Sequence, residues 1–360
     1  MYDLMMEQVW RGVEGVQDIS TWVTRYATRR YNPTGVPKKI VQAWLLLQKS
    51  AYTVPFYDTQ PGTSGSIFAA SPRLNIFNVP ECCAPLSLYY NASDVIEAWK
   101  LLLDGAREDQ PNGKKPLTDT ETFGYDITQV TVQGISNAAI SIYHSIVQAY
   151  KSGNPQWIKS NASIMYDMIT DVDNILATQP LYLTGRWLHN ASYWNTTPCK
   201  HSPSCESVAT PERRTCGFSG ITKASCVAAG CCFDGSTNGT EQRCYLPNLC
   251  EGQLLQFNAR NQITMWGPME SHLHDYAYKL WSGHTKDYYL QRWKLWVQAL
   301  LDSVEIGASK PLEDSQVGIQ IFEMQWNLNV TQTYPAEPSG ENATAISQLL
   351  LEKYQNLLFE

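Results

Sequence analysis

The chain has 360 residues, 43% of them hydrophobic and 17% charged, a balance that suits one large globular domain or a domain with a smaller companion. The formal net charge of -7 and the absence of any Lys/Arg run exclude the charge pattern of nucleic-acid-binding proteins, so no nucleic-acid partner is expected. No apolar run is long enough to span a bilayer, and the first residues have neither the basic nor the apolar region of a signal peptide.

Cysteines and glycosylation acceptors are nevertheless typical of the oxidising secretory route. Ten cysteines are present, six of them in the stretch from Cys205 to Cys244. Seven acceptors have the form Asn-X-Ser/Thr, namely Asn91, Asn161, Asn190, Asn195, Asn238, Asn329 and Asn342. Because such a chain needs an export signal, we expect it to be the C-terminal part of a larger lysosomal or extracellular protein.

The first hundred residues predict three helices and a long loop. Apolar residues at helical spacing follow Asp18, a predicted N-cap, and the pattern stops before Pro33. A second pattern follows Pro37, with Ile40, Val41, Trp44, Leu45 and Tyr52 on one side. Residues 57–86 show no periodicity, so this loop must be tied down or functional. Ser93 or Asp94 is predicted to cap the third helix, which continues through Trp99 and Leu102.

Further helices are predicted along the rest of the chain. Residues 107–122 are polar and rich in turn formers, which indicates an exposed connection. Strand alternation is scarce outside the cysteine-rich stretch. One predicted helix begins at Asp126 and another near Pro155. A shorter one contains Leu183 and Trp187, and the last two cover 317–326 and 346–358. The sequence therefore predicts an all-α multi-helix bundle with a small disulfide-rich domain inserted.

The stretch from residue 259 to 300 has an unusual load of aromatic residues. Its later half carries Trp281, Tyr289, Trp293, Trp296 and Leu300 at helical spacing, which predicts an amphipathic core helix. Gly267 and Pro268 favour a loop before that helix, and Trp266 lies in this loop. The front of the stretch, 260–276, is our candidate for the wall of a ligand-binding cleft.

Acidic and histidine residues in this front part do not form a convincing reaction centre. On one helix, Glu270 and Asp275 would point about 140° apart and His272 and His274 about 200° apart, because each residue adds about 100°. They would not face one substrate or chelate one metal ion, so neither a metal site nor a cofactor is expected. Three arginines, Arg30, Arg260 and Arg292, are interpreted as structural groups that bind carboxylates or carbonyls.

The cysteine-rich stretch is best interpreted as a disulfide framework. Its six cysteines are separated by ten, nine, four, zero and eleven residues. About forty residues bury too little apolar area to fold alone, so disulfides worth roughly 2–4 kcal/mol each are required. Six cysteines allow fifteen pairings, and spacing does not choose among them. Zinc is the alternative, but two Cys-X2-Cys pairs at matching distance are missing.

The run ERRTCGFSGITKASCVAAGCCFDGSTNGTEQRCYLP resembles a trefoil (P-type) domain. The resemblance implies the pairs Cys205–Cys232, Cys216–Cys231 and Cys226–Cys244. Cys199 and Cys250 flank the module, and we predict that they pair with each other. The pairing of Cys82 and Cys83 stays open.

Trefoil domains are similar to small lectins, and the resemblance implies a sugar groove with Asp234 and an aromatic residue before the last cysteine. Arg243 takes that aromatic position, and Tyr245 follows the cysteine. Two hypotheses remain for the module: a structural spacer, or a lectin that binds sugar through Asp234 and Tyr245.

Four other segments, WVTRYATRRY with AWLLLQKSAY, SLYYNASDVIEAWKLLL, ITMWGP and DYAYKLWSGHTKDYYLQRWKLW, resemble the C-terminal helical domain of the α-N-acetylglucosaminidases, glycoside hydrolase family 89. We therefore expect three parts: residues 1–198 and 251–360 form the helical domain, and residues 199–250 form an inserted trefoil. The insertion is a departure from the family pattern.

The resemblance implies a retaining glycosidase that removes terminal α-linked N-acetylglucosamine from heparan sulfate or a mucin-type glycan. Such a mechanism needs two carboxyl groups about 5–5.5 Å apart, and in this family they lie on a barrel that precedes the helical domain. This chain has no room for a barrel, so its expected role is to wall the cleft with Trp266, Tyr276 and Tyr89. Tyr89 stands where relatives have tryptophan, and Trp266 is expected either to stack on sugar or to fill the domain interface.

Two other functions fit the sequence. The chain is alternatively a non-catalytic glycan-binding module that acts through its trefoil, with the helices as scaffold. It is also a candidate homo-oligomerisation domain. Deletion of 199–250 and sizing of the chain in solution distinguish these hypotheses.

Overall fold

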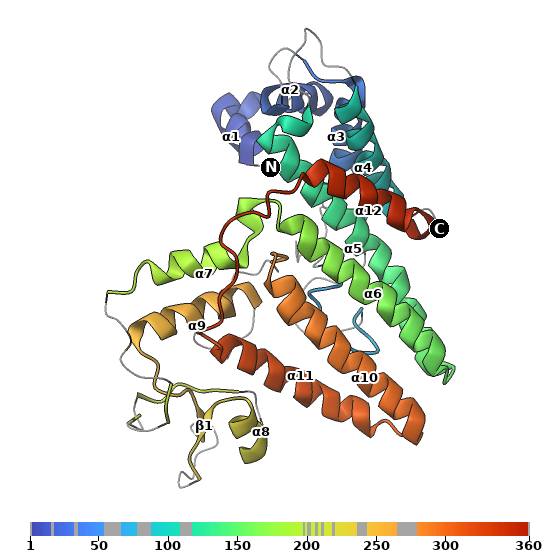
Figure 1. The fold of residues 1–360 in the computed structure, drawn as a ribbon. Coiled ribbons are helices and arrows are strands. Elements are labelled where there is room, and N and C mark those ends of the chain that lie inside the picture. The colour runs from blue at the N-terminus through green and yellow to red at the C-terminus, as the bar shows by residue number, and fades with distance from the viewer. Residues whose placement is uncertain are drawn as a thin grey trace. The chain divides into compact units, whose positions relative to one another are not determined.

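The computed structural model describes residues 2–15, 18–31, 35–53, 66–77, 88–108, 117–196, 199, 203–205, 208–209, 212–217, 220–235, 243–264 and 279–358. They are mainly helical (Figure 1), which confirms the predicted all-α class with a disulfide-rich insertion. The α-helices are α1 (Tyr2–Arg11), α2 (Ile19–Tyr31), α3 (Lys38–Lys49), α4 (Ala92–Arg107), α5 (Glu121–Lys151), α6 (Pro155–Leu176), α7 (Thr184–Ser192), α8 (Lys223–Ala228), α9 (Glu251–Thr264), α10 (Leu290–Ile306), α11 (Lys310–Leu328) and α12 (Ala343–Leu358).

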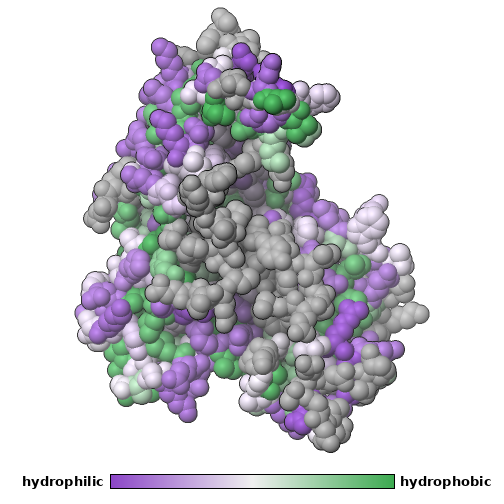
Figure 2. Space-filling view, turned by 180° about the vertical axis from the view of Figure 1, so that it is seen from behind, coloured by the Kyte–Doolittle hydropathy of each residue, from purple (hydrophilic) through white to green (hydrophobic). Residues whose placement is uncertain are grey.

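Shorter elements connect these helices. Single 3-10 turns are η1 (Gly12–Glu14), η3 (Leu117–Asp119) and η4 (Pro180–Tyr182), and η6 (Thr285–Tyr289) is a π-helix that leads into α10. Strands β1 (Cys232–Phe233) and β2 (Cys244–Tyr245) pair antiparallel. In the described part of the chain, no helix has the length and hydropathy needed to cross a membrane. Hydrophobic and hydrophilic residues are interspersed over the coloured atoms of Figure 2.

The chain forms two compact units, each built from separated stretches of sequence. The first unit contains Met1–Thr59, Leu88–Ala138 and Glu341–Glu360, and the second contains Gln60–Ser87 and Ala139–Gly340. The trefoil-like region is therefore part of the second unit.

The first unit is built around α4, with α3 and α12 packed on it. Trp99 of α4 is fully buried, and its indole N–H donates to Ser347 Oγ of α12 at 2.7 Å. Ser347 Oγ also lies 2.7 Å from Thr131 Oγ1 of α5. A Cβ at Gly134 would lie 2.9 Å from the Trp99 ring, so this glycine allows α5 to approach α4 closely.

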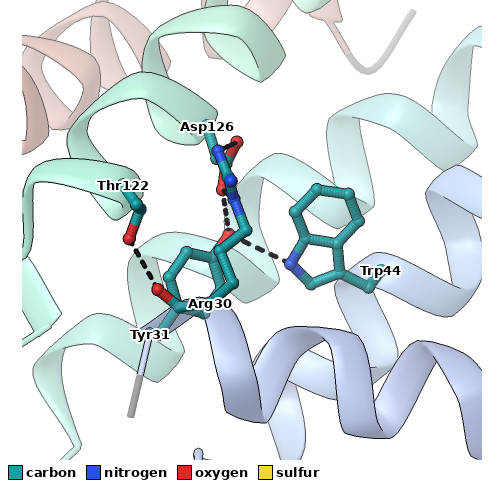
Figure 3. Close-up of polar contacts among 5 residues, drawn as sticks. All are labelled: Arg30, Tyr31, Trp44, Thr122 and Asp126. Atoms are coloured by element: carbon teal, nitrogen blue, oxygen red, sulfur yellow. Dashed lines mark hydrogen bonds and ion pairs between the residues drawn. The ribbon is translucent and has the colours of Figure 1, made fainter. Parts of the chain in front are cut away.

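A buried polar network joins α2, α3 and α5 (Figure 3). Arg30 binds the carboxylate of Asp126 through two nitrogens at 2.5 and 2.8 Å, and Tyr31 donates to the same carboxylate at 2.5 Å. Trp44 donates to the Tyr31 hydroxyl at 3.0 Å, and Thr122 donates to the Arg30 carbonyl at 2.7 Å. Burial raises the pKa of Asp126 although Arg30 opposes the shift. Arg30 is thus a structural ion-pair residue, as predicted.

The second unit packs α10 against α6 and α11. Trp293 and Trp296 of α10 are fully buried and contact the ring of Tyr143, with centroids 6.3 and 6.1 Å away. Trp293 and Tyr143 also hold residues 66–77, the described part of the long loop. Trp293 donates to Phe68 O at 3.1 Å, and the Tyr143 hydroxyl donates to Arg73 O at 3.0 Å. The prediction that this loop is tied down is confirmed for those residues.

Several predicted helix starts were wrong because the capping partner could not be identified from spacing. Asn91, rather than Ser93 or Asp94, caps α4, and its side chain accepts a hydrogen bond from the Ser93 amide at 3.1 Å. Helix α5 begins at Glu121, and Asp126 lies one turn inside it, where Arg30 makes an acidic helical residue favourable. Tyr52 lies beyond the end of α3.

Helix α9 was not predicted, and Arg260, the first residue of the candidate cleft wall, lies within it. The helix buries Arg260, Asn261 and Thr264 together with Phe257 and Ile263. Three polar residues on its buried face interrupt the apolar periodicity that identifies a helix. Asp18 is confirmed as a cap, since it accepts a hydrogen bond from the Ser20 amide at 2.9 Å.

Candidate functional site

The candidate cleft wall falls only partly within the described residues. Trp266 and Tyr276 lie outside them, as do Glu270 and Asp275. Tyr89 is described in the first unit, where it is partly buried and donates to Ala51 O at 2.8 Å. The structure therefore describes the residues that precede and follow segment 265–278 and those that pack on them. We call this set, which includes Arg260, Asp173 and Arg292, the frame.

The frame begins with Arg260 near the end of α9. Its guanidinium donates to the carbonyls of Trp326 at 3.2 Å and Gln332 at 2.6 Å, and it lies 4.5 Å from the centre of the Trp326 ring. Burial lowers the pKa of Arg260. Its donors are directed at backbone carbonyls, so the prediction of a structural arginine is confirmed.

Beyond segment 265–278, the chain is anchored by a buried carboxylate. Asp173 of α6 accepts hydrogen bonds from the Gly283 amide at 2.8 Å, the Lys286 amide at 3.1 Å and the Ser282 hydroxyl at 3.2 Å. Ser282 also pairs with Leu183 as an isolated parallel bridge. Burial raises the pKa of Asp173 to about 6, against the opposing effect of these three donors.

Buried aromatic side chains fill the space between these two anchors. Tyr288, Tyr289, Trp326 and Ile263 form one cluster, with Trp281 packed against it. His284 is fully buried within 4.8 Å of the Tyr289 ring, and burial lowers its pKa to about 3. A histidine with that pKa is neutral at any physiological pH, so it acts here as a packing residue.

A second buried arginine completes the frame. Arg292 of α10 forms an ion pair with Glu323 of α11 at 3.1 Å and donates to Ala69 O at 3.2 Å. Its guanidinium also lies 5.2 Å from the Tyr288 ring centre. Burial raises the pKa of Glu323, and Arg292 counteracts that shift. This arginine is also structural, as predicted.

The charged groups of the frame stabilise the fold and are not arranged for catalysis. Its two buried carboxyl groups, Asp173 and Glu323, are both engaged by structural donors within the described residues. A glycosidase needs one ionised and one protonated carboxyl group directed at the sugar. The frame instead fixes the chain that precedes and follows residues 265–278, through Arg260 on one side and through Asp173 with its donors on the other.

The two predicted groove residues of the trefoil are brought together by a third side chain. Arg213 donates to Asp234 at 2.7 Å, and its guanidinium lies 4.3 Å from the centre of the Tyr245 ring. Arg213 is largely buried, with 12% of its side chain exposed, and Asp234 is 22% exposed. A sugar hydroxyl that approached Asp234 would have to compete with this guanidinium.

Four disulfides hold the trefoil region, and they join the expected partners: Cys199–Cys250, Cys205–Cys232, Cys216–Cys231 and Cys226–Cys244. The sulfurs of Cys226, Cys231 and Cys244 lie within 4.8 Å of one another. All three are consumed by disulfides, so this cluster has no thiolate for zinc.

The trefoil core continues into the helical body. Cys216, Cys226 and Cys244 belong to the same buried cluster as Phe257 of α9 and Met324 of α11. Gln325 of α11 also donates to Ala228 O at the end of α8, at 2.7 Å. The trefoil is thus seated on α9 and α11 through shared apolar burial.

Six of the seven glycosylation acceptors are described, and their surroundings differ. Asn91, Asn190, Asn329 and Asn342 are exposed, and Asn195 is partly buried. Asn161 is 8% exposed within α6, where its amide donates to Trp157 O at 2.9 Å. A glycan on Asn161 would have no room at this buried position without opening the helix packing. Asn238 lies outside the described residues.

Two residues of the site were missed by sequence reasoning. Asp173 lies four positions after Ile169, on the apolar face of α6, and its partners are more than a hundred positions away. Arg213 lies three positions before Cys216, the second of the six trefoil cysteines, and was considered only as part of the trefoil run. No local pattern identifies either interaction.

Family models match most of the chain. The α-N-acetylglucosaminidase (NAGLU) C-terminal domain matches residues 22–209 and 240–353, and the trefoil (P-type) domain matches residues 205–247. The trefoil match covers the gap between the two parts of the helical match and overlaps them at 205–209 and 240–247.

Similar proteins include human α-N-acetylglucosaminidase, which is 26% identical over 98% of this chain. The chain spans only 38% of that protein's length. Rat trefoil factor 2 is 39% identical over 59 residues, 16% of this chain and 42% of the rat protein.

Two solved structures from Clostridium perfringens have a similar fold. CpGH89, in complex with its substrate GlcNAc-α-1,4-galactose, matches with a TM-score of 0.66 at 23% identity, over 95% of this chain and 32% of its own. A family 89 glycoside hydrolase in complex with 2-acetamido-1,2-dideoxynojirmycin matches with a TM-score of 0.66 at 24% identity, over 94% and 32%.

Proposed function

Since the chain belongs to the α-N-acetylglucosaminidase C-terminal domain family, we propose that it is the helical part of a retaining glycoside hydrolase that removes terminal α-linked N-acetylglucosamine. The observation that carries this proposal is the family match over 22–209 and 240–353, together with similarity to 38% of the human enzyme. The catalytic carboxyl groups would lie in a barrel that precedes this chain.

Within that enzyme, we assign segment 265–278 to the wall of the substrate cleft. The assignment is supported by the frame, in which Arg260 and Asp173 anchor the chain on either side of the segment. Trp266 and Tyr276 would contact the sugar, with Tyr89 as a third contributor. Heparan sulfate and mucin-type glycans are the proposed substrate classes, and the division into 1–198, 199–250 and 251–360 is part of the proposal.

The activity is tested by comparing two purified proteins on a chromogenic α-N-acetylglucosaminide. The protein encoded together with its upstream sequence is expected to turn over the substrate, and this chain alone is expected to be inactive. Turnover by the chain alone, or an upstream-extended protein without activity on α-linked N-acetylglucosamine, contradicts the proposal.

The cleft wall is tested in the extended protein with two variants of Trp266. Trp266→Ala removes an aromatic face, so KM should rise by about tenfold for a loss of about 1.4 kcal/mol. Trp266→Phe keeps an aromatic face and should change KM by less. An unchanged KM in both variants contradicts a contact with substrate.

For the trefoil, we propose a structural role in bracing α9 and α11. The proposal is supported by the shared core with Phe257 and Met324 and by the engagement of Asp234 with Arg213. The intact chain is expected to show no binding to immobilised glycans that end in α-linked N-acetylglucosamine. Binding that is abolished by Asp234→Asn would contradict this role and favour the lectin hypothesis.

The chain is also proposed to pass through the secretory route to a lysosomal or extracellular destination. Four disulfides and the exposed glycosylation acceptors support this location. Glycopeptide mapping of the secreted protein tests it, and a protein with reduced cysteines and no glycan on any acceptor would contradict it.

A further inference from the structure

A hollow lies on the seam between the trefoil and the end of α11. Among the described residues it has a volume of about 310 Å³ and is lined on the trefoil side by Pro203, Ala229 and Pro247. Leu328, Gln325 and Asn329 line it on the side of α11. This volume is near the lower end of the range of roughly 300–1,000 Å³ for sites that hold small molecules.

One of the lining residues is itself a glycosylation acceptor. Asn329 ends α11 and is followed by Val330 and Thr331, which complete the acceptor sequence. The residue is exposed, and the chain turns here, since the Gln332 amide donates to Asn329 O at 3.2 Å. Unlike Asn161, it lies outside regular helix and is accessible.

The Asn329 side chain is held in a definite orientation. Its Nδ2 donates to Gln332 Oε1 at 3.3 Å, and Gln332 Nε2 in turn donates to Asp287 at 3.0 Å. A glycosylated asparagine keeps one hydrogen on Nδ2, so this contact is compatible with a sugar on the same nitrogen. The Thr331 hydroxyl donates to Asn329 Oδ1 at 3.4 Å.

We propose that Asn329 carries an N-linked glycan whose first N-acetylglucosamine packs into this hollow and holds the trefoil on α11. The apolar face of the sugar would pack on Pro247, Ala229 and Leu328, which line the hollow. Its acetamido group would hydrogen-bond to the side-chain amide of Gln325, which lines the same hollow. Burial of this sugar face would add to the shared core beneath the seam. The inference relies on the proposed secretory route.

The test uses the full chain secreted from eukaryotic cells that attach high-mannose glycans. Glycopeptide mapping is expected to find Asn329 occupied. Amide exchange is then compared for three forms: the intact glycoprotein, the protein trimmed by an endoglycosidase to one N-acetylglucosamine, and Thr331→Ala, which lacks the acceptor. Peptides that cover 225–230 and 325–330 should exchange equally in the first two forms and about tenfold faster in the third, which corresponds to about 1.4 kcal/mol.

The matched control is Thr331→Ser, which keeps the acceptor sequence and should exchange like the parent. Equal exchange with and without the sugar, or an unoccupied Asn329 in a protein whose Asn91 and Asn342 carry glycans, overturns the proposal while leaving the secretory route intact. A protein without glycan on any acceptor overturns both.

Discussion

The trefoil and the frame around segment 265–278 are held together in opposite ways, although both belong to the second unit. The trefoil has two short strands and a six-residue helix, and disulfides supply the constraint that its small core lacks. The frame has no described disulfide, and its stability depends on Arg260, Arg292 and Asp173 within an aromatic cluster. The disulfides constrain the trefoil directly, whereas the buried charged groups of the frame depend on their hydrogen-bond and ion-pair partners.

This difference matters for where function can be placed. A module held by covalent bonds keeps its shape when its surface changes, so an inserted trefoil can vary at surface positions such as Asp234, which Arg213 engages here. A frame held by buried ions has little freedom, because each group that loses its partner is left unsatisfied in the interior. The frame therefore suits a supporting role for the chain on either side of residues 265–278.

The largest effect is expected from the frame. Arg292→Met would leave Glu323 without its partner and Ala69 O without a donor, which should cost about 3–5 kcal/mol of unfolding free energy. Thermal and denaturant unfolding measure the loss. Lys294→Met, at an exposed position on the same helix, is the control and should stay within about 0.5 kcal/mol. Equal effects of the two changes would contradict a buried-ion frame.

The next effect concerns the trefoil. Replacing Cys226 and Cys244 together by serine opens a loop with a sequence separation of 18, which should cost about 3 kcal/mol. Limited proteolysis should then cut the trefoil while α10 and α6 stay protected. If both regions lose protection together, the trefoil and the frame form one cooperative structure and the contrast between them fails.

A pH effect is expected from Asp173. Burial raises its pKa to about 6 in the folded protein, above the unfolded value of about 3.9, so the folded state binds the proton more tightly. The resulting stabilisation is complete below about pH 4 and is lost as the pH rises through about 6. The parent should gain roughly 1–2 kcal/mol on going from pH 7 to pH 4.5, relative to Asp173→Asn.

Melting temperatures of both proteins across this range measure that difference. Asp173→Asn removes the titrating group but keeps an acceptor, because one amide oxygen can accept the Gly283 and Lys286 N–H groups, which both bind Oδ1 of Asp173. Identical pH profiles would show that another group controls the response.

The smallest effect is expected at the N-cap of α8. Thr222 accepts a hydrogen bond from the Ser225 amide at 3.1 Å, and Thr222→Ala should cost about 0.5–1 kcal/mol. The disulfide at Cys226 holds the same short helix, so unfolding should stay local and be visible in amide exchange of 223–228. Thr222→Ser keeps the hydroxyl and serves as the control. A loss above about 2 kcal/mol would mean that the disulfides contribute less than inferred.

Local patterns in the amino-acid sequence determined the helical class and most helices. Helix α6 shows this well, because Ile158, Met165 and Ile169 share one face by the 3.6-residue period and are all buried. The pairing within the trefoil followed from the resemblance to that family, since spacing alone left fifteen pairings open, and the three observed disulfides agree with it. The flanking pair Cys199–Cys250 was predicted separately and is also observed.

Only the tertiary structure decided which polar residues are buried and which partners satisfy them. Asp173 finds its donors 109 to 113 positions along the chain, and Arg260 finds carbonyls 66 and 72 positions away. Helix α9 was missed for the same reason, since its polar residues face inward toward these distant partners. Periodicity records which face of a helix avoids water, but the pairing of buried polar groups depends on long-range packing that no local pattern contains.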